Sequence, residues 1–207
     1  MGESQYEIIE AKTEEQKKMV FSIRYQAYSS NNSIDSLEEK LFYDKYDYME
    51  NTASYLLLKD DTPIGSVRKC SYNPEKNWLD IPSLKNFKKE IKKHVGFNKK
   101  ILEINKLCVT PNHQKNPMNI LLLSNRDIAQ GIMEKTDYYV AGLKQKDLKF
   151  YEKIFPFIPI SKSKKYEGLK FETILCLLRF NPKFKVIINE SKKTRSFKAL
   201  LKKIRRN

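Results

Sequence analysis

The alternation of apolar and polar residues divides the first half of the chain into short strands and one amphipathic helix. Residues 5–11 alternate as a half-buried strand, and Thr13 with Gln16 forms a capping box for a helix that runs through Ala27. A second, short helix is expected at Ser36–Leu41. Strands at 54–59 and 63–72 flank a polar turn, so they predict an antiparallel hairpin.

The second half alternates helices with apolar strands. Ser83 is expected to cap a helix whose apolar stripe includes Phe87, and a nearly continuous apolar strand spans Ile101–Thr110. A helix at Met118–Lys135, a strand at 137–143, a helix at 147–155 and a strand at 169–180 follow. Antiparallel strands first and a β-α-β-α-β half later indicate an α+β fold with three α/β/α layers, in which helices cover both faces of a mixed central sheet.

The central apolar strand carries one carboxylate, Glu103, and one cation, Lys106. An ionised group in a buried strand is costly unless it has a task, although the two could simply pair at a strand end. A polar turn, 111–117, and a helix start follow this strand, and free amides at a helix start suit a phosphate. This order resembles the junction at which acyltransferases of the GNAT type hold a phosphopantetheine arm.

Composition limits the architecture and the chemistry. The 207 residues, 40% of them hydrophobic, are enough for one sizeable core, so we expect one domain at 1–190 and a tail at 191–207. No apolar run approaches the length of a membrane span and no signal pattern opens the chain, which favours a cytoplasmic location. Three separated cysteines and two isolated histidines predict neither a metal site nor a Ser-His triad.

The net charge of +15 is concentrated in two segments. Residues 85–100 carry seven lysines against one glutamate, and residues 192–207 carry eight basic residues and no acidic one. The tail also has an apolar stripe, so it is expected to form a basic amphipathic helix. Such a helix could bind the inner face of an anionic membrane, an acidic carrier protein or nucleic-acid phosphates. Nucleic acid is disfavoured because no RNA- or DNA-binding motif accompanies it.

Four short motifs follow one another in the first half of the chain: Arg24-Tyr25-x-x-Tyr28, Asp44-x-x-Asp47, Ile64-Gly65-x-x-Arg68 and Glu103-x-x-Lys106. Their order and spacing resemble the acyl-homoserine lactone synthases and N-acyl amino acid synthases, the autoinducer-synthase-like branch of the GNAT superfamily. The likeness runs from about residue 6 to residue 155 and implies the GNAT acyltransferase fold.

The resemblance also implies roles for individual residues. Glu103 matches a strand carboxylate that helps to deprotonate the acceptor amine, and Tyr151 lies where a GNAT tyrosine acts as general acid toward the leaving thiolate. Six residues would line or brace the amine side: Arg24, Tyr28, Asp44, Asp47, Arg68 and Lys106. Arg24 could instead make an ordinary surface ion pair, and the two aspartates could sit in a loop that solvates them.

Departures from the family pattern refine the expected substrates. Phe42 and Lys106 stand where homoserine lactone synthases usually have Glu and Arg, which disfavours S-adenosylmethionine and favours another amine, such as an amino acid. The stretch from Gln114 to Asn119 lacks the glycines that let GNAT amides approach a CoA pyrophosphate, and Pro117 removes an amide donor. An acidic acyl carrier protein is therefore expected to serve as donor in preference to acyl-CoA.

The reaction requires a neutral amine, a base and donors to the oxyanion. Amides at the splayed strand end 106–109 would supply the donors, and no bound cofactor or metal is needed. The expected donor-binding residues are Leu107, Val109, Gln114, Lys115, Asn116 and Asn119. The sequence thus predicts an N-acyltransferase that moves a fatty acyl group to an amino acid or related amine. The alternative is a catalytically degenerate GNAT-fold module that binds anionic membrane or nucleic acid.

Overall fold

The computed structural model describes residues 5–155, 157–166 and 168–179 of the chain. Eight strands form one mixed sheet in the order β1-β2-β3-β4-β5-β8-β6, with β7 beside β8. The strands are β1 (Tyr6–Glu10), β2 (Thr52–Lys59), β3 (Thr62–Tyr72), β4 (Ile101–Val109), β5 (Tyr138–Lys144), β6 (Ile158–Pro159), β7 (Lys164–Lys165) and β8 (Glu172–Arg179). Among the described strands, β4 and β5 pair in parallel and the other pairs are antiparallel.

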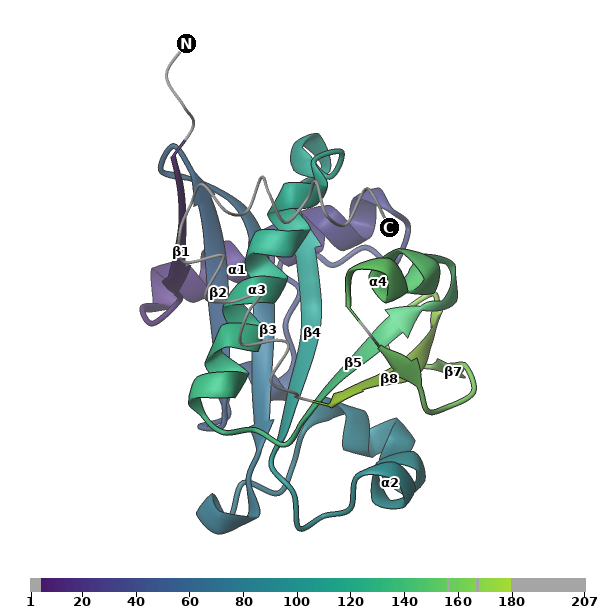
Figure 1. Ribbon diagram of the computed structural model, residues 1–207. Coiled ribbons are helices and arrows are strands. Elements are labelled where there is room, and N and C mark those ends of the chain that lie inside the picture. Colours follow the sequence, from purple (N-terminus) through teal and green to yellow (C-terminus); the bar gives the residue numbers. More distant parts are fainter. Residues whose placement is uncertain (1–4, 156, 167, 180–207) are drawn as a thin grey trace.

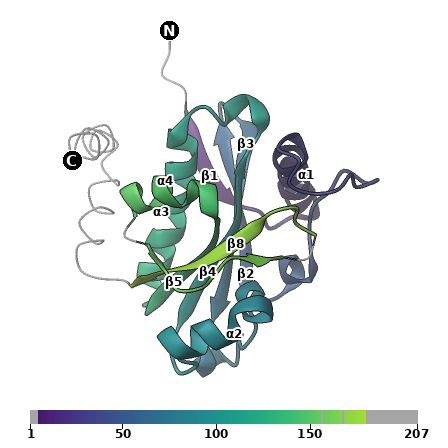
Figure 2. The same cartoon turned by 90° about the vertical axis from the view of Figure 1, so that its right-hand side faces the viewer.

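Helices cover both faces of this sheet, which confirms the predicted three layers. Helices α1 (Glu14–Ser30) and α2 (Pro82–His94) lie on one face, and α3 (Pro117–Met133) and α4 (Leu148–Ile154) lie on the other (Figures 1 and 2). Alternating strand residues divide the core accordingly: Leu57 packs on the α3 side, and its neighbour Leu56 packs under α1. None of the described helices combines the length and apolar character needed to cross a bilayer.

Most predicted elements are present with shifted ends, and the capping box of Thr13 and Gln16 is confirmed. The short helix expected at Ser36–Leu41 was wrong. Lys40 has φ of 53°, a left-handed conformation that a helix does not accept, and a 3-10 helix η1 (Lys45–Tyr48) follows the segment instead. The Ser83 cap was also wrong, because α2 begins at Pro82 and Ile81 precedes it without a side-chain cap.

The basic tail expected at 191–207 lies outside the described residues. The three cysteines, Cys70, Cys108 and Cys176, are free and buried.

Candidate active site

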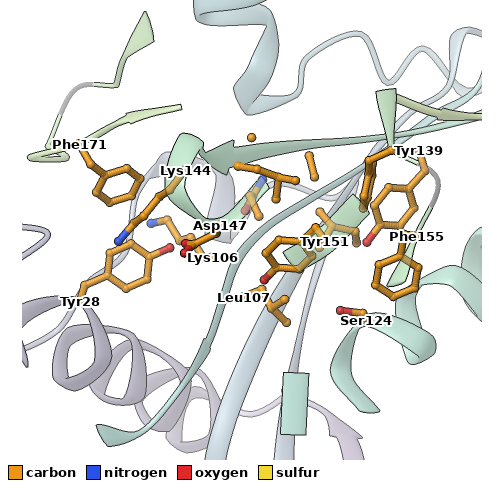
Figure 3. A pocket seen from close by; sticks show the side chains of 16 residues that line it. Tyr28, Lys106, Leu107, Ser124, Tyr139, Lys144, Asp147, Tyr151, Phe155 and Phe171 are labelled. Atoms are coloured by element: carbon orange, nitrogen blue, oxygen red, sulfur yellow. The ribbon is translucent and has the colours of Figure 1, made fainter. Parts of the chain in front are cut away.

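Strands β4 and β5 separate near the middle of the sheet. Their parallel pairing runs from Ile101 with Tyr138 to Ile104 with Ala141 and does not continue to the ends of the strands. A cavity of about 120 Å³ lies at this opening, between the two strands and α4. Figure 3 shows Tyr28, Lys106, Lys144 and Phe171 at one end of this cavity, Tyr139 and Phe155 at the other, and Tyr151 between them.

A second cavity, of about 460 Å³, lies on the face of the sheet that carries α1 and α2. Glu103, Arg68 and Asp44 contribute its polar groups, and much of the remaining wall is aromatic. The two cavities meet, because five residues line both: Tyr28, Asn105, Lys106, Gly142 and Phe171. The arrangement offers one compartment on each side of the opening between β4 and β5.

A bulge in β4 shapes the junction between the cavities. Lys106 has φ of 50°, and the register between β3 and β4 shifts so that Lys106 and Leu107 together oppose Val67. A regular strand would send neighbouring side chains to opposite faces. The bulge instead lets Asn105 and Lys106 both reach the charged residues of the second cavity.

Three cations and two carboxylates form a network beside this junction. Arg24 pairs with Asp47 at 2.6 Å, and Arg68 pairs with Asp47 at 2.9 Å and with Asp44 at 2.6 Å. Lys106 Nζ lies 2.9 Å from Asp44 Oδ2 and 3.8 Å from Asp47 Oδ2. The guanidinium groups of Arg24 and Arg68 are buried, and so is the carboxylate of Asp47, whose side chain is 1% exposed. The surface ion pair considered above for Arg24 is therefore excluded, and so is solvation of Asp47, whereas the Asp44 side chain is 39% exposed.

The Asp44-x-x-Asp47 motif presents its carboxylates by folding on itself. Asp44 caps η1 by accepting from the Tyr46 N–H at 2.9 Å, and Asp47 accepts from the Asp44 N–H at 3.0 Å. Burial alone would raise the pKa of both aspartates. The adjacent Arg68, with Lys106 at Asp44 and Arg24 at Asp47, outweighs burial and holds both pKa values below their usual range.

Glu103 is buried at the floor of the second cavity and does not pair with Lys106. Its Oε2 accepts from the Ser83 main-chain N–H at 2.8 Å, and its Oε1 accepts from Asn105 Nδ2 at 3.1 Å. Burial raises the pKa of Glu103, and the hydrogen bonds from Ser83 and Asn105 and the charge of Arg68 offset this only in part. A carboxyl group with a raised pKa is suited to take a proton near neutral pH.

Three further groups have shifted pKa values. Burial and the charges of Arg68 and Arg24 lower the pKa of Lys106 to about 8, against the opposing effect of the aspartates. Burial, with Asp147 nearby, raises the pKa of Tyr151 to about 12, so its hydroxyl keeps its proton at neutral pH. Burial likewise raises the pKa of Tyr28. Leu107 lines the first cavity, whereas Val109 packs into the core.

The main-chain amides of the turn between β4 and α3 donate hydrogen bonds to acceptors within the same turn. The main-chain N–H groups of five residues donate within the turn, and these are His113, Gln114, Asn116, Met118 and Asn119. The side chains of Gln114 and Asn119 also donate to carbonyls of the turn and strand end. Gln114, Lys115, Asn116 and Asn119 line neither of the two cavities.

Asn105 is a site residue that the sequence reasoning missed. It lies two residues after Glu103 on the same strand, and this spacing alone places both side chains on one face. Tyr166 and Phe171, which complete the aromatic wall, come from the segment before β8 and carried no local signal. The pairing of β8 with β5 in the folded sheet brings that segment beside Glu103.

Comparison with known proteins shows which solved structures share this fold. The structure of FeeM, an N-acyl amino acid synthase from uncultured soil microbes, is similar with a TM-score of 0.73 at 14% identity, over 88% of this chain and 94% of that chain. The acyl-homoserine lactone synthase LasI is similar with a TM-score of 0.66 at 13% identity, over 89% of this chain and 94% of that chain. The CoA-dependent acyl-homoserine lactone synthase BjaI is similar with a TM-score of 0.63 at 15% identity, over 91% of this chain and 89% of that chain.

These structures share the GNAT acyltransferase fold with the chain. No curated protein matches the chain by sequence. The family model of the N-acyl amino acid synthase FeeM matches residues 19–179, which include every charged residue of the network described above. The chain therefore belongs to the N-acyl amino acid synthase FeeM family, and it is an N-acyltransferase.

Proposed function

We propose that the chain transfers a fatty acyl group from acyl carrier protein to the α-amine of an amino acid. The observation that carries this proposal is the pair of cavities that meet between β4 and β5, with Tyr151 on one side and Glu103 on the other. The first cavity would hold the pantetheine arm and its thioester. The second cavity would hold the amine and has room for apolar groups of both substrates.

Glu103 is the proposed base of the reaction. It takes a proton from the acceptor's ammonium group, directly or through one water, and the neutral nitrogen then attacks the thioester carbonyl. A carbon–nitrogen bond forms as the carbon–sulfur bond breaks. Tyr151 donates its proton to the leaving thiolate and regains one from solvent, while the attacking nitrogen loses its second proton to solvent as the amide forms. Main-chain amides near Leu107, where β4 no longer pairs with β5, stabilise the oxyanion.

The turn between β4 and α3 supports a carrier protein as donor. A CoA pyrophosphate needs several free amides at a helix start, and five of the turn's amides already donate within the turn. The carrier protein's arm has a single phosphodiester, so it needs fewer such contacts. The exposed lysines of α2 and of residues 146–149 offer a basic surface to an acidic protein.

The charge network supports an acceptor that carries a carboxylate. Arg24, Arg68 and Lys106 are three cations, while Asp44 and Asp47 are two anions, so the group holds one surplus positive charge. Lys106 Nζ is close to Asp44 but lacks a hydrogen-bond partner of good geometry. An α-carboxylate of the acceptor would provide that partner at the junction where its amine must react.

The test is thiol release and product mass from purified protein, with acyl carrier protein and acyl-CoA donors offered to a panel of amino acids and simple amines. Glu103→Gln keeps the side chain's shape but removes the base, so turnover should fall at least tenfold near pH 7 and recover in part at higher pH. Glu75→Gln is the matched control, since Glu75 pairs with Lys100 away from both cavities, and it should be unaffected. No thiol release with any donor would favour the binding module instead.

A further inference from the structure

Asn105 connects the charge network to the proposed base. Its Oδ1 accepts from Arg68 Nε at 2.7 Å, and its Nδ2 donates to Glu103 Oε1 at 3.1 Å. A guanidinium group can only donate, so the amide oxygen has to face Arg68 and the amide nitrogen has to face Glu103. Arg68 is itself fixed by Asp44 and Asp47, which leaves Asn105 one orientation.

We propose that Asn105 is a positioning residue for acyl transfer, which holds the Glu103 carboxylate at the second cavity and stabilises its ionised form. This proposal rests on the proposed role of Glu103 as base. Among the described residues, Asn105 donates to one oxygen of Glu103, and the Ser83 N–H at the start of α2 donates to the other. Loss of one donor leaves a buried carboxylate half satisfied and favours its protonated form, which cannot accept a proton.

The charged and titratable groups around Glu103 come from several elements. They are Arg68 and Cys70 on β3, Tyr46 on η1, Tyr166 before β8 and Lys85 on α2, and Asp44 and Lys106 line the same cavity. Burial raises the pKa of Cys70 to about 11 and that of Tyr46 to about 12, and it raises the pKa of Tyr166 as well. These three groups therefore stay neutral while Glu103 titrates, and Arg68 stays charged.

The informative variant is Asn105→Asp, because aspartate has nearly the same size as asparagine and the change affects the bond to Glu103 but not the bond to Arg68. It keeps an oxygen for Arg68 Nε and replaces the donor to Glu103 with a second acceptor. The pKa of Glu103 is read directly from the carboxyl resonance of ¹³C-labelled glutamate, assigned by its absence in Glu103→Gln. It should rise by about one unit or more in Asn105→Asp, and the acid limb of kcat/KM should move up by the same amount.

Asn105→Ala, which removes both bonds, gives a second measurement should the aspartate variant fail to fold, and it should raise the pKa of Glu103 as well. In a Glu103→Gln background, Asn105→Asp should leave the pH profile unchanged, because its effect passes through Glu103. An unchanged Glu103 titration in either variant overturns the proposal, and so does a pH shift that survives without Glu103. A shifted titration in a protein without turnover would keep the positioning role and refute acyl transfer.

Discussion

Replacement of Asp47 with asparagine should destabilise the protein strongly while leaving its size unchanged. The buried carboxylate of Asp47 pairs with Arg24 at 2.6 Å and with Arg68 at 2.9 Å, and it accepts from the Asp44 N–H at 3.0 Å. Removing one partner of a buried ion pair leaves uncompensated charge, which costs about 3–5 kcal/mol. That cost is a large part of the roughly 5–15 kcal/mol by which a domain is stable.

Asp44→Asn is the matched comparison, because Asp44 belongs to the same motif and also binds Arg68. Its side chain is 39% exposed, so solvent screens its charge, and the loss should be roughly 1 kcal/mol. The pKa of Asp47 is lowered in the folded protein, so its stabilisation is complete above the usual aspartate pKa of about 4. The difference between wild type and Asp47→Asn should shrink only as the pH falls below that value.

Urea unfolding followed by far-ultraviolet circular dichroism measures both variants. With an m-value of about 2 kcal/mol per molar urea, Asp47→Asn should lower the midpoint by about 2 M without changing the slope. A stability equal to wild type, or a larger loss in Asp44→Asn than in Asp47→Asn, would refute the assignment of Asp47 as the buried centre of the network.

Three further predictions follow from the site and the charge distribution. The KM for an amino acid acceptor should rise above about pH 8 as Lys106 loses its charge, and Lys106→Arg should move this limb to higher pH; an identical limb in the variant would exclude Lys106 as its source. Acyl carrier protein should outperform the matching acyl-CoA, and its KM should rise steeply with salt; equal turnover of the two would count against charge-steered docking. Removal of residues 192–207 deletes eight basic residues and should leave turnover of small thioesters intact. The truncation should either weaken co-sedimentation with anionic vesicles or raise the KM for carrier protein. No change in either measurement would show that the tail serves neither partner.

Local patterns were sufficient for the elements whose signals are local. The capping box of α1, the hairpin of β2 and β3 and the apolar run of β4 each lie within a few residues, and all are present. The segment 36–41 has a helical composition, yet it stays irregular because Phe42 is held elsewhere. The main-chain N–H of Phe42 donates to the Phe21 carbonyl at 3.0 Å, and the Phe42 ring packs on Tyr28.

The site was predictable only in part, for the same reason. The charged motifs lie on the strands and loop that line the candidate site, because a buried charge in an apolar strand needs a partner. Their pairing was not predictable. Lys106 turns to Asp44 rather than to Glu103 because a bulge in β4 redirects it, and Ser83 serves Glu103 through its backbone rather than as a cap. These contacts depend on sheet register and on the position of α2, which no local spacing encodes.

The most direct test of the acyltransferase assignment is mass spectrometry of lipids from cells that overexpress this chain. Wild-type protein should yield new ions whose fragments are a fatty acyl group and an intact amino acid joined by an amide bond. Cells that express Glu103→Gln at the same level should contain little of this product. A lipid profile unchanged by the wild-type protein, or equal accumulation of the product with Glu103→Gln, would contradict the account.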